Sequence, residues 1–247
     1  MKLTILLTLS LIIIIGSVAH STAQPARIEG TCKAGETAPS IGSWTWPATS
    51  LVEVYVRLQD FAVEEVPAML TAMQNWDASA SENGLGVRFE YKGTVAETKS
   101  CGNCLTILRG KIADKRHGAE LQAFSKRNDQ IIDYAWIVID PSYRKSETLT
   151  SIVAHELGHS LGLLDCYGCK RGSSAMNRLN ITLRLFQIQV ADWPNGINGP
   201  TSCDMAQVKE AYKELRNGVR PAPTIKSLRT ADEGEEPEED DTPIVLP

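Results

Sequence analysis

Hydrophobic and polar positions between residues 52 and 216 follow two periods. A period of two, typical of strands, occurs at 52–58 and 87–91, and short apolar runs predict further strands at 105–108 and 135–139. A helical period occurs at 63–78 and 146–161. A third helix is expected at 203–216, where Thr201 and Asp204 have the spacing of a capping box. Strands separated by helices predict a layered domain of α and β structure.

The two ends of the chain differ from this middle part. Residues 1–23 contain one lysine, an apolar run from Leu3 to Ile15 and small residues after it, which is the pattern of a secretory signal. The alternative is an uncleaved membrane anchor, but the run is short for a bilayer that needs ~20 residues. At the other end, 222–247 is expected to be a disordered acidic tail. We therefore predict a single folded domain over 24–221, with no stable membrane insertion once the signal is removed.

The overall charge mainly describes the tail. The 247 residues carry 25 Lys and Arg against 30 Asp and Glu, a net charge of -5. Residues 232–241 hold eight of the acids and no base. Without these acids and Lys2, 24 bases face 22 acids, so the folded part is close to neutral. A nearly neutral domain lacks the basic excess that nucleic-acid binding needs, and we expect no nucleic-acid partner.

Six cysteines include two pairs with CxxC spacing, Cys101 with Cys104 and Cys166 with Cys169. In a cytosolic protein two such pairs would suggest a structural zinc site with four thiolates. The signal segment favours disulfides instead. Local closure of each CxxC pair, which leaves Cys32 with Cys203, is the least demanding of fifteen pairings, but the sequence does not select among them.

One segment of the 146–161 helix carries candidate chemistry. His155 and His159 are four residues apart, so they lie on one helix face and can bind one metal ion. Glu156 lies on a neighbouring edge, within reach of a metal-bound water. Gly162 can adopt positive φ and turn the chain back, which would bring Asp165 to the metal as a third ligand. His117 is an alternative third ligand, although its basic neighbours favour a solvent-facing position.

This segment resembles the metzincin clan of zinc metallopeptidases. The clan signature, HExxHxxGxx followed by a His or Asp ligand, matches residues 155–165, and Ser173–Asn177 is similar to the clan's Met-turn, with Met176 beneath the metal. The lead-in at 149–154 is similar to the active-site helix of matrixins. Most matrixins have histidine at the third ligand position, whereas Asp165 resembles the snapalysin-like variant. The residues around Cys32 lack the cysteine-switch pattern of matrixin prodomains.

The resemblance implies an α+β fold of the zincin type, in which a twisted mixed sheet packs on an active-site helix and further helices. It also implies a zinc-dependent endopeptidase, with one catalytic Zn²⁺ on His155, His159 and Asp165 and with Glu156 as the general base. Its partner would be a peptide or protein substrate, extended along an edge strand, for which 105–109 is a candidate. Structural calcium and the natural substrate are not indicated.

We expect a secreted monomer, extracellular or periplasmic. Two other hypotheses remain open at this stage. The first is a binding protein without catalysis, although an intact Glu156 argues against it. The second is zinc held by the two CxxC pairs.

Overall fold

The computed structural model describes residues 30–33, 35–112, 118–125, 130–177, 197–216 and 244–246. In chain order, the elements are β1 (Leu51–Arg57), the 3-10 helix η1 (Leu58–Asp60), α1 (Val66–Glu82), β2 (Arg88–Val95), β3 (Cys104–Arg109), β4 (Ala119–Phe124), β5 (Tyr134–Ile139), α2 (Ser146–Ser160), α3 (Ser202–Arg216) and β6 (Ile244–Leu246). The predicted α+β class is confirmed, and the predicted elements occur with shifts of a few residues at their ends.

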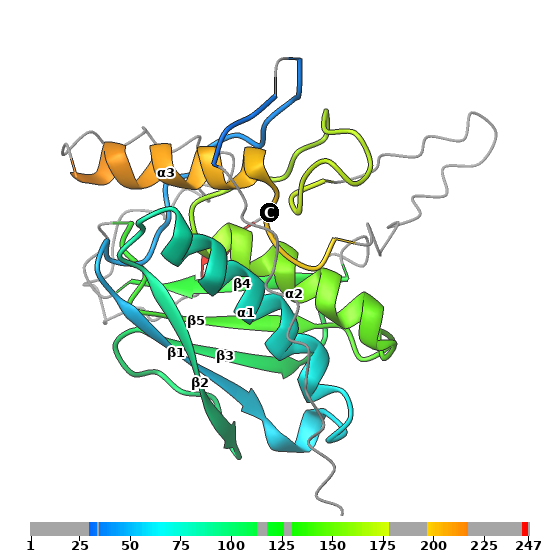
Figure 1. Ribbon diagram of the computed structural model, residues 1–247. Coiled ribbons are helices and arrows are strands. Elements are labelled where there is room, and N and C mark those ends of the chain that lie inside the picture. The colour runs from blue at the N-terminus through cyan, green and yellow to red at the C-terminus, as the bar shows by residue number, and fades with distance from the viewer. Residues whose placement is uncertain are drawn as a thin grey trace, which may run out of the picture.

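The strands form one mixed sheet in the order β2-β1-β3-β5-β4-β6. The pairs β1–β2, β1–β3 and β3–β5 are parallel. β4 runs antiparallel to β5, and β6 runs antiparallel to β4. In Figure 1, α1 crosses one face of this sheet, and α3 lies at the top of the view, away from the strands.

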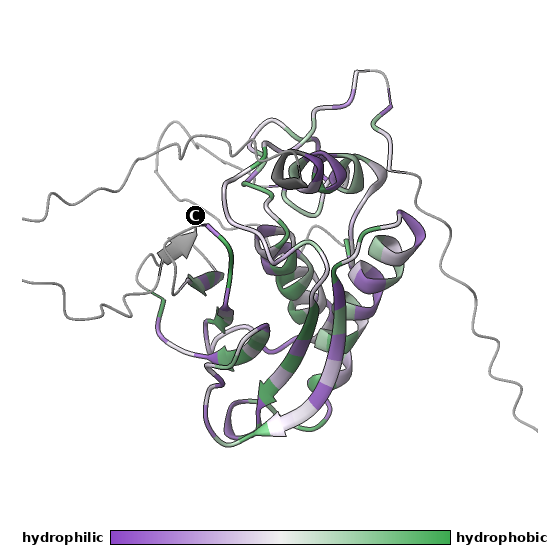
Figure 2. Cartoon of the chain, turned by 90° about the vertical axis from the view of Figure 1, so that its left-hand side faces the viewer, coloured by the Kyte–Doolittle hydropathy of each residue, from purple (hydrophilic) through white to green (hydrophobic). Residues whose placement is uncertain are grey.

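Two helices bury the apolar face of the sheet. α1 packs on β2 and α2 packs on β4 and β5, while α1 and α2 also contact each other. Val52, Val54 and Val56 of β1 are fully buried, as the period of two predicts. In Figure 2 the strands and helices carry both green (hydrophobic) and purple (hydrophilic) stretches. α2 therefore packs against both the sheet and α1.

Two expectations about the sheet were wrong. The sequence pattern missed β4, although Ala119, Leu121 and Ala123 alternate with Glu120 and Gln122 as in a strand. The segment 105–109 is not an edge strand, because β3 lies between β1 and β5. Parallel strands buried on both sides have continuous apolar sequences, and this is why β3 resembled an isolated apolar run.

The predicted tail needs a correction at its last residues. Residues 244–246 form strand β6, so the expectation of disorder over 222–247 does not hold for these three residues. The signal segment at 1–23, like His117, lies outside the described residues. No helix within the described ranges is long and apolar enough to cross a membrane.

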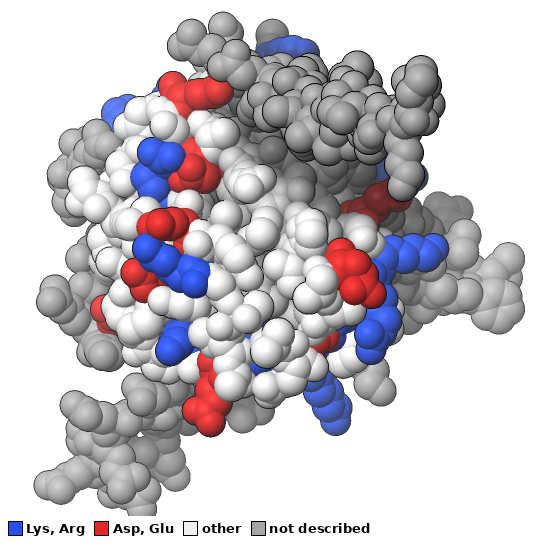
Figure 3. Space-filling model, turned by 60° about the horizontal axis from the view of Figure 1, so that its bottom comes forward, with Lys and Arg blue, Asp and Glu red and all other residues white. Residues whose placement is uncertain are grey.

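Charged side chains on the face drawn in Figure 3 are mixed in sign rather than separated. Among the described residues, Arg88 forms an ion pair with Asp77, and Lys92 forms ion pairs with both Glu90 and Glu53. They are partly exposed, so each contributes little to stability. They do balance the charge locally, as expected for a domain that is close to neutral.

Candidate metal centre

Helix α2 supplies two of the three predicted ligands. Leu149, Ile152, Val153 and Leu157 are fully buried along it, which fixes the rotation of the helix about its axis. The indole Nε1 of Trp76 on α1 donates a hydrogen bond of 2.7 Å to the Ala154 carbonyl, next to the first histidine. His155 and His159 are 1% and 3% exposed, so both imidazoles lie inside the protein.

Each imidazole is oriented by a backbone carbonyl. His155 Nδ1 lies 2.8 Å from the Ala175 carbonyl oxygen, and His159 Nδ1 lies 2.8 Å from the Leu163 carbonyl oxygen. A carbonyl can only accept, so both Nδ1 atoms carry the proton and donate it. In the neutral imidazoles the lone pairs then lie on the Nε2 atoms, as in metal-binding histidines whose other nitrogen is hydrogen-bonded.

The turn after α2 brings Asp165 back to the histidines. Gly162 has a φ of +90°, as predicted, and its N–H donates to the His159 carbonyl. The N-terminal segment holds this turn from outside. Gly42 N–H donates to the Gly162 carbonyl at 2.7 Å, and Leu164 N–H donates to the Ser40 carbonyl at 2.9 Å. Asp165 thus follows a turn that is fixed on both sides.

The three predicted ligand atoms meet at one point. His155 Nε2 lies 3.1 Å from His159 Nε2 and 3.0 Å from Asp165 Oδ1, and His159 Nε2 lies 3.5 Å from Asp165 Oδ1. Ligands bound tetrahedrally to zinc at 2.0–2.1 Å are ~3.3 Å apart, so these separations fit a single ion. Two imidazole nitrogens and one carboxylate are also a donor set that suits Zn²⁺. The residues present therefore fit the metal that the motif implies.

The electrostatics of the cluster favour a positive charge at its centre. Burial opposes the protonated form of His159, but hydrogen bonding to Asp165 and the charges of Asp165 and Glu156 outweigh it and raise the pKa of His159. Burial likewise opposes the charged form of Asp165, yet the two histidines hold the pKa of this carboxyl far below its usual range. Asp165 is therefore an anion here, and the field that retains a proton on an imidazole also favours a metal cation.

Glu156 is 3% exposed and lies between the two histidines in the sequence of α2. Its negative charge acts on His159, which places it close to the cluster.

The segment 166–176, which follows Asp165, folds back and contacts the helix that carries the two histidines. Cys166 and Cys169 form a disulfide, and Cys166 N–H donates to the Met176 carbonyl at 2.7 Å. Met176 is fully buried against α2, where a Cβ at Gly158 would collide with its sulfur. Because Ala175 accepts the His155 hydrogen bond, the predicted Met-turn residues and the first ligand are directly connected.

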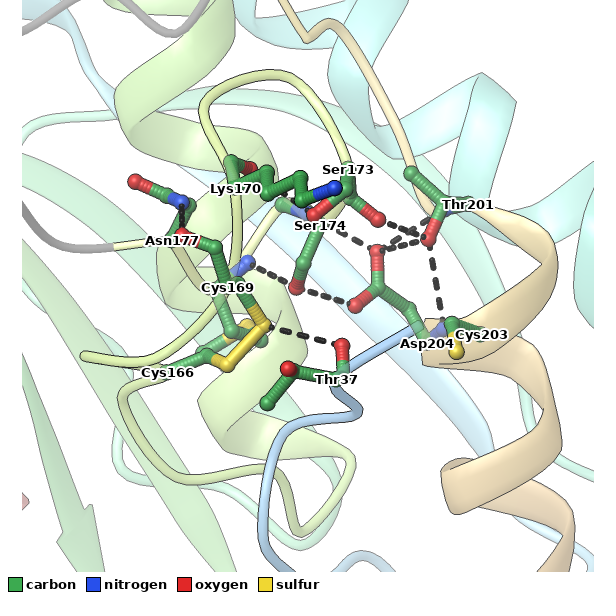
Figure 4. Close-up of a disulfide and its surroundings, with 12 residues drawn as sticks. Thr37, Cys166, Cys169, Lys170, Ser173, Ser174, Asn177, Thr201, Cys203 and Asp204 are labelled. Atoms are coloured by element: carbon green, nitrogen blue, oxygen red, sulfur yellow. Dashed lines mark hydrogen bonds between the residues drawn. A yellow bond between two sulfur atoms is a disulfide. The ribbon is translucent and has the colours of Figure 1, made fainter. Parts of the chain in front are cut away.

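A buried carboxylate from α3 anchors this turn (Figure 4). Asp204 is fully buried and accepts hydrogen bonds from Ser174 Oγ, from the Ala175 N–H at 2.8 Å and from the Thr201 N–H at 2.8 Å. Burial raises the pKa of Asp204 although these hydrogen bonds favour its charged form. The Thr201–Asp204 contacts are those of the predicted capping box. The same carboxylate thus begins α3 and supports the residue that orients His155.

The sequence pattern missed the link from Asp204 to the turn, since a capping box alone gives no sign of a second partner. It also gave no role to Tyr167, whose hydroxyl donates to Asp165 Oδ2 at 3.3 Å. In the sequence, only its position two residues after Asp165 could have suggested that Tyr167 contacts this predicted ligand.

All six cysteines form disulfides: Cys32–Cys203, Cys101–Cys104 and Cys166–Cys169. This is the pairing with local closure of each CxxC pair, the least demanding of the possible pairings. The alternative of a four-thiolate zinc site is therefore wrong, because no cysteine is left free. Cys32 also takes part in a disulfide rather than in a cysteine switch.

Comparisons with known proteins add the following. No protein-family model matches the sequence, and no curated protein is similar to it. Among solved structures, the chain is similar to metalloproteinase-II from Bacteroides fragilis, with a TM-score of 0.39, 10% identity and coverage of 72% of this chain and 58% of that one. It is also similar to myroilysin, with a TM-score of 0.40, 13% identity and coverage of 75% and 99%. The match thus spans less than two thirds of the Bacteroides protein.

Proposed function

We propose that this protein is a zinc-dependent endopeptidase of the metzincin type, matrixin-like in its active-site helix, with Asp165 in place of the usual third histidine. One observation carries the proposal: two imidazole nitrogens and one carboxylate oxygen converge at 3.0–3.5 Å in a buried site. The adjacent Glu156 supplies the base that hydrolysis needs.

Bound zinc would polarise the scissile carbonyl and make a water molecule more acidic. Glu156 would take a proton from that water as it attacks the carbonyl carbon, and then deliver the proton to the leaving amine. The carbonyls of Ala175 and Leu163 keep the two imidazoles in the required tautomer. The anionic Asp165 would lower the net charge of a bound metal, so a water there would be less acidic than with three histidines and would depend more on Glu156.

We also propose that the protein is exported, with residues 1–23 as its signal and 24–221 as one catalytic domain. Three disulfides within the described residues support this proposal, because such bonds persist in oxidising compartments.

Digestion of a peptide library by the full exported chain, with and without a chelator, tests the activity. Glu156→Ala should retain one zinc per chain and lose cleavage by ~10²–10⁴-fold, the usual contribution of a general base. Glu147→Ala, an exposed change in the first turn of the same helix, is the matched control and should keep full activity. Retained cleavage in Glu156→Ala would refute the mechanism.

A further inference from the structure

The edge of the sheet next to β4 is covered by the chain's own C-terminal segment. Ile244, Val245 and Leu246 pair antiparallel with Ala123, Gln122 and Leu121. On its other side, β4 pairs with β5. Without β6, β4 would therefore be an edge strand, with a row of unpaired N–H and C=O groups.

The strand at this covered edge contacts the helix that carries two of the candidate ligands. α2, which carries His155, Glu156 and His159, packs on β4 and on the neighbouring β5. An extended chain added to β4 therefore lies along the strand that supports the active-site helix. β2 forms the opposite edge of the sheet, three strands away from β5.

Sheet edges bind extended peptides through main-chain hydrogen bonds, which depend little on the identity of the side chains. An endopeptidase must hold its substrate extended next to the metal, and the edge of β4 is suited to that task. A substrate and the segment 244–246 would then require the same N–H and C=O groups of β4. They cannot pair with it at the same time.

We propose that the segment Ile244–Leu246 is a resident occupant of the β4 edge, which competes there with an extended substrate until it is displaced. The assignment of the edge to substrate rests on the proposed function. The occupant itself follows from the pairing of β6 with β4.

The sequence of the segment suits a displaceable occupant rather than a permanent strand. Only three residues pair, and Pro243 and Pro247 on either side have no N–H to donate, so the pairing cannot extend through them. A three-residue strand binds weakly, but a linked segment has an effective concentration of roughly 1 mM. If the free segment binds with a Kd of about 0.1 mM, the linked one would raise KM about tenfold.

Val245→Pro in the full chain tests the competition, because it removes an N–H from the middle of the segment. With a fluorogenic peptide substrate, KM should fall about tenfold while kcat stays unchanged. Asp240→Pro places the same residue outside the described strand and is the matched control. The free peptide of residues 242–247, Thr-Pro-Ile-Val-Leu-Pro, should inhibit Val245→Pro competitively and inhibit Asp240→Pro less.

A binding measurement separates this inference from the proposed function. In the Glu156→Ala background, fluorescein-labelled Thr-Pro-Ile-Val-Leu-Pro should bind the Val245→Pro chain about tenfold more tightly than the Asp240→Pro chain, as followed by anisotropy. If no variant cleaves any peptide but this difference persists, the proposed function fails and the docking edge stands. Equal binding would overturn the inference. So would a lower thermal midpoint for Val245→Pro without any fall in KM, because β6 would then be a structural strand.

Discussion

The candidate metal centre has a helix side and a loop side, and the protein holds them by different means. His155 and His159 lie one turn apart on α2, so the regular geometry of a buried helix fixes their spacing. Asp165 and Met176 belong to a loop, and this loop is held by the Cys166–Cys169 disulfide, by Asp204 and by the segment around Gly42. The helix side therefore depends on local structure, whereas the loop side depends on contacts between distant parts of the chain.

The largest effect is expected from a change on the helix side. His155→Ala removes a ligand and leaves the Ala175 carbonyl without its donor. Mutation of a residue that only hydrogen-bonds to a metal ligand typically lowers affinity or activity ~10–100-fold. Loss of the ligand itself should lower zinc affinity and activity by more than this. Zinc per chain after dialysis, measured by atomic absorption, checks this. An unchanged zinc content would mean that the metal lies elsewhere.

Asp204→Asn should weaken the loop side without touching a ligand. The amide can accept at only one of the two positions that the carboxylate uses, so buried donors of Ser174, Ala175 or Thr201 lose their partner. The free energy of unfolding should fall by ~1–3 kcal/mol and zinc affinity by ~10-fold. Urea unfolding and a competing chelator measure the two. Glu210→Gln, on the exposed part of α3, should change neither.

The two short disulfides give the sharpest test of the comparison, since each closes a loop of the same length. Replacing either pair by serines should cost about 2 kcal/mol of stability from loop entropy. Only the Cys166/Cys169 pair adjoins a ligand, so only its loss should also lower zinc affinity, by ~10-fold. The Cys101/Cys104 pair at the start of β3 serves as the control. Equal effects on zinc affinity would contradict the distinction between helix side and loop side.

The smallest effect is expected for Tyr167→Phe. The tyrosine is 56% exposed, and its hydroxyl donates a long hydrogen bond of 3.3 Å to Asp165. A single exposed hydrogen bond contributes ~0.5 kcal/mol, so zinc affinity should fall only about twofold. Isothermal titration with zinc measures this. A loss above tenfold would show that the loop side depends on Tyr167 more than on its disulfide.

The same contrast explains how much the sequence could predict. The ligands of α2 and the turn at Gly162 follow from spacing over eight residues, and the fold class follows from hydrophobic periods. Asp165 was predicted from the turn at Gly162, with His117 as an alternative, and the resemblance to metzincins then favoured it; a loop has no period that places its side chains. The contact of Asp204 with Ala175 spans 29 residues and leaves no local pattern. β4 was missed although its residues alternate over the whole strand, and the edge position of 105–109 was wrong because strand order in a sheet is a long-range property.

The Cys32–Cys203 bond has a consequence for damage by proteolysis. The two cysteines are 171 positions apart, and all three candidate ligands lie between them. A single cut of the backbone anywhere in this ring leaves both pieces covalently joined. A nicked molecule would therefore run as one band on a gel without reductant and as two bands with it. In the proposed endopeptidase, such a ring would keep the candidate metal centre together after a first accidental self-cleavage.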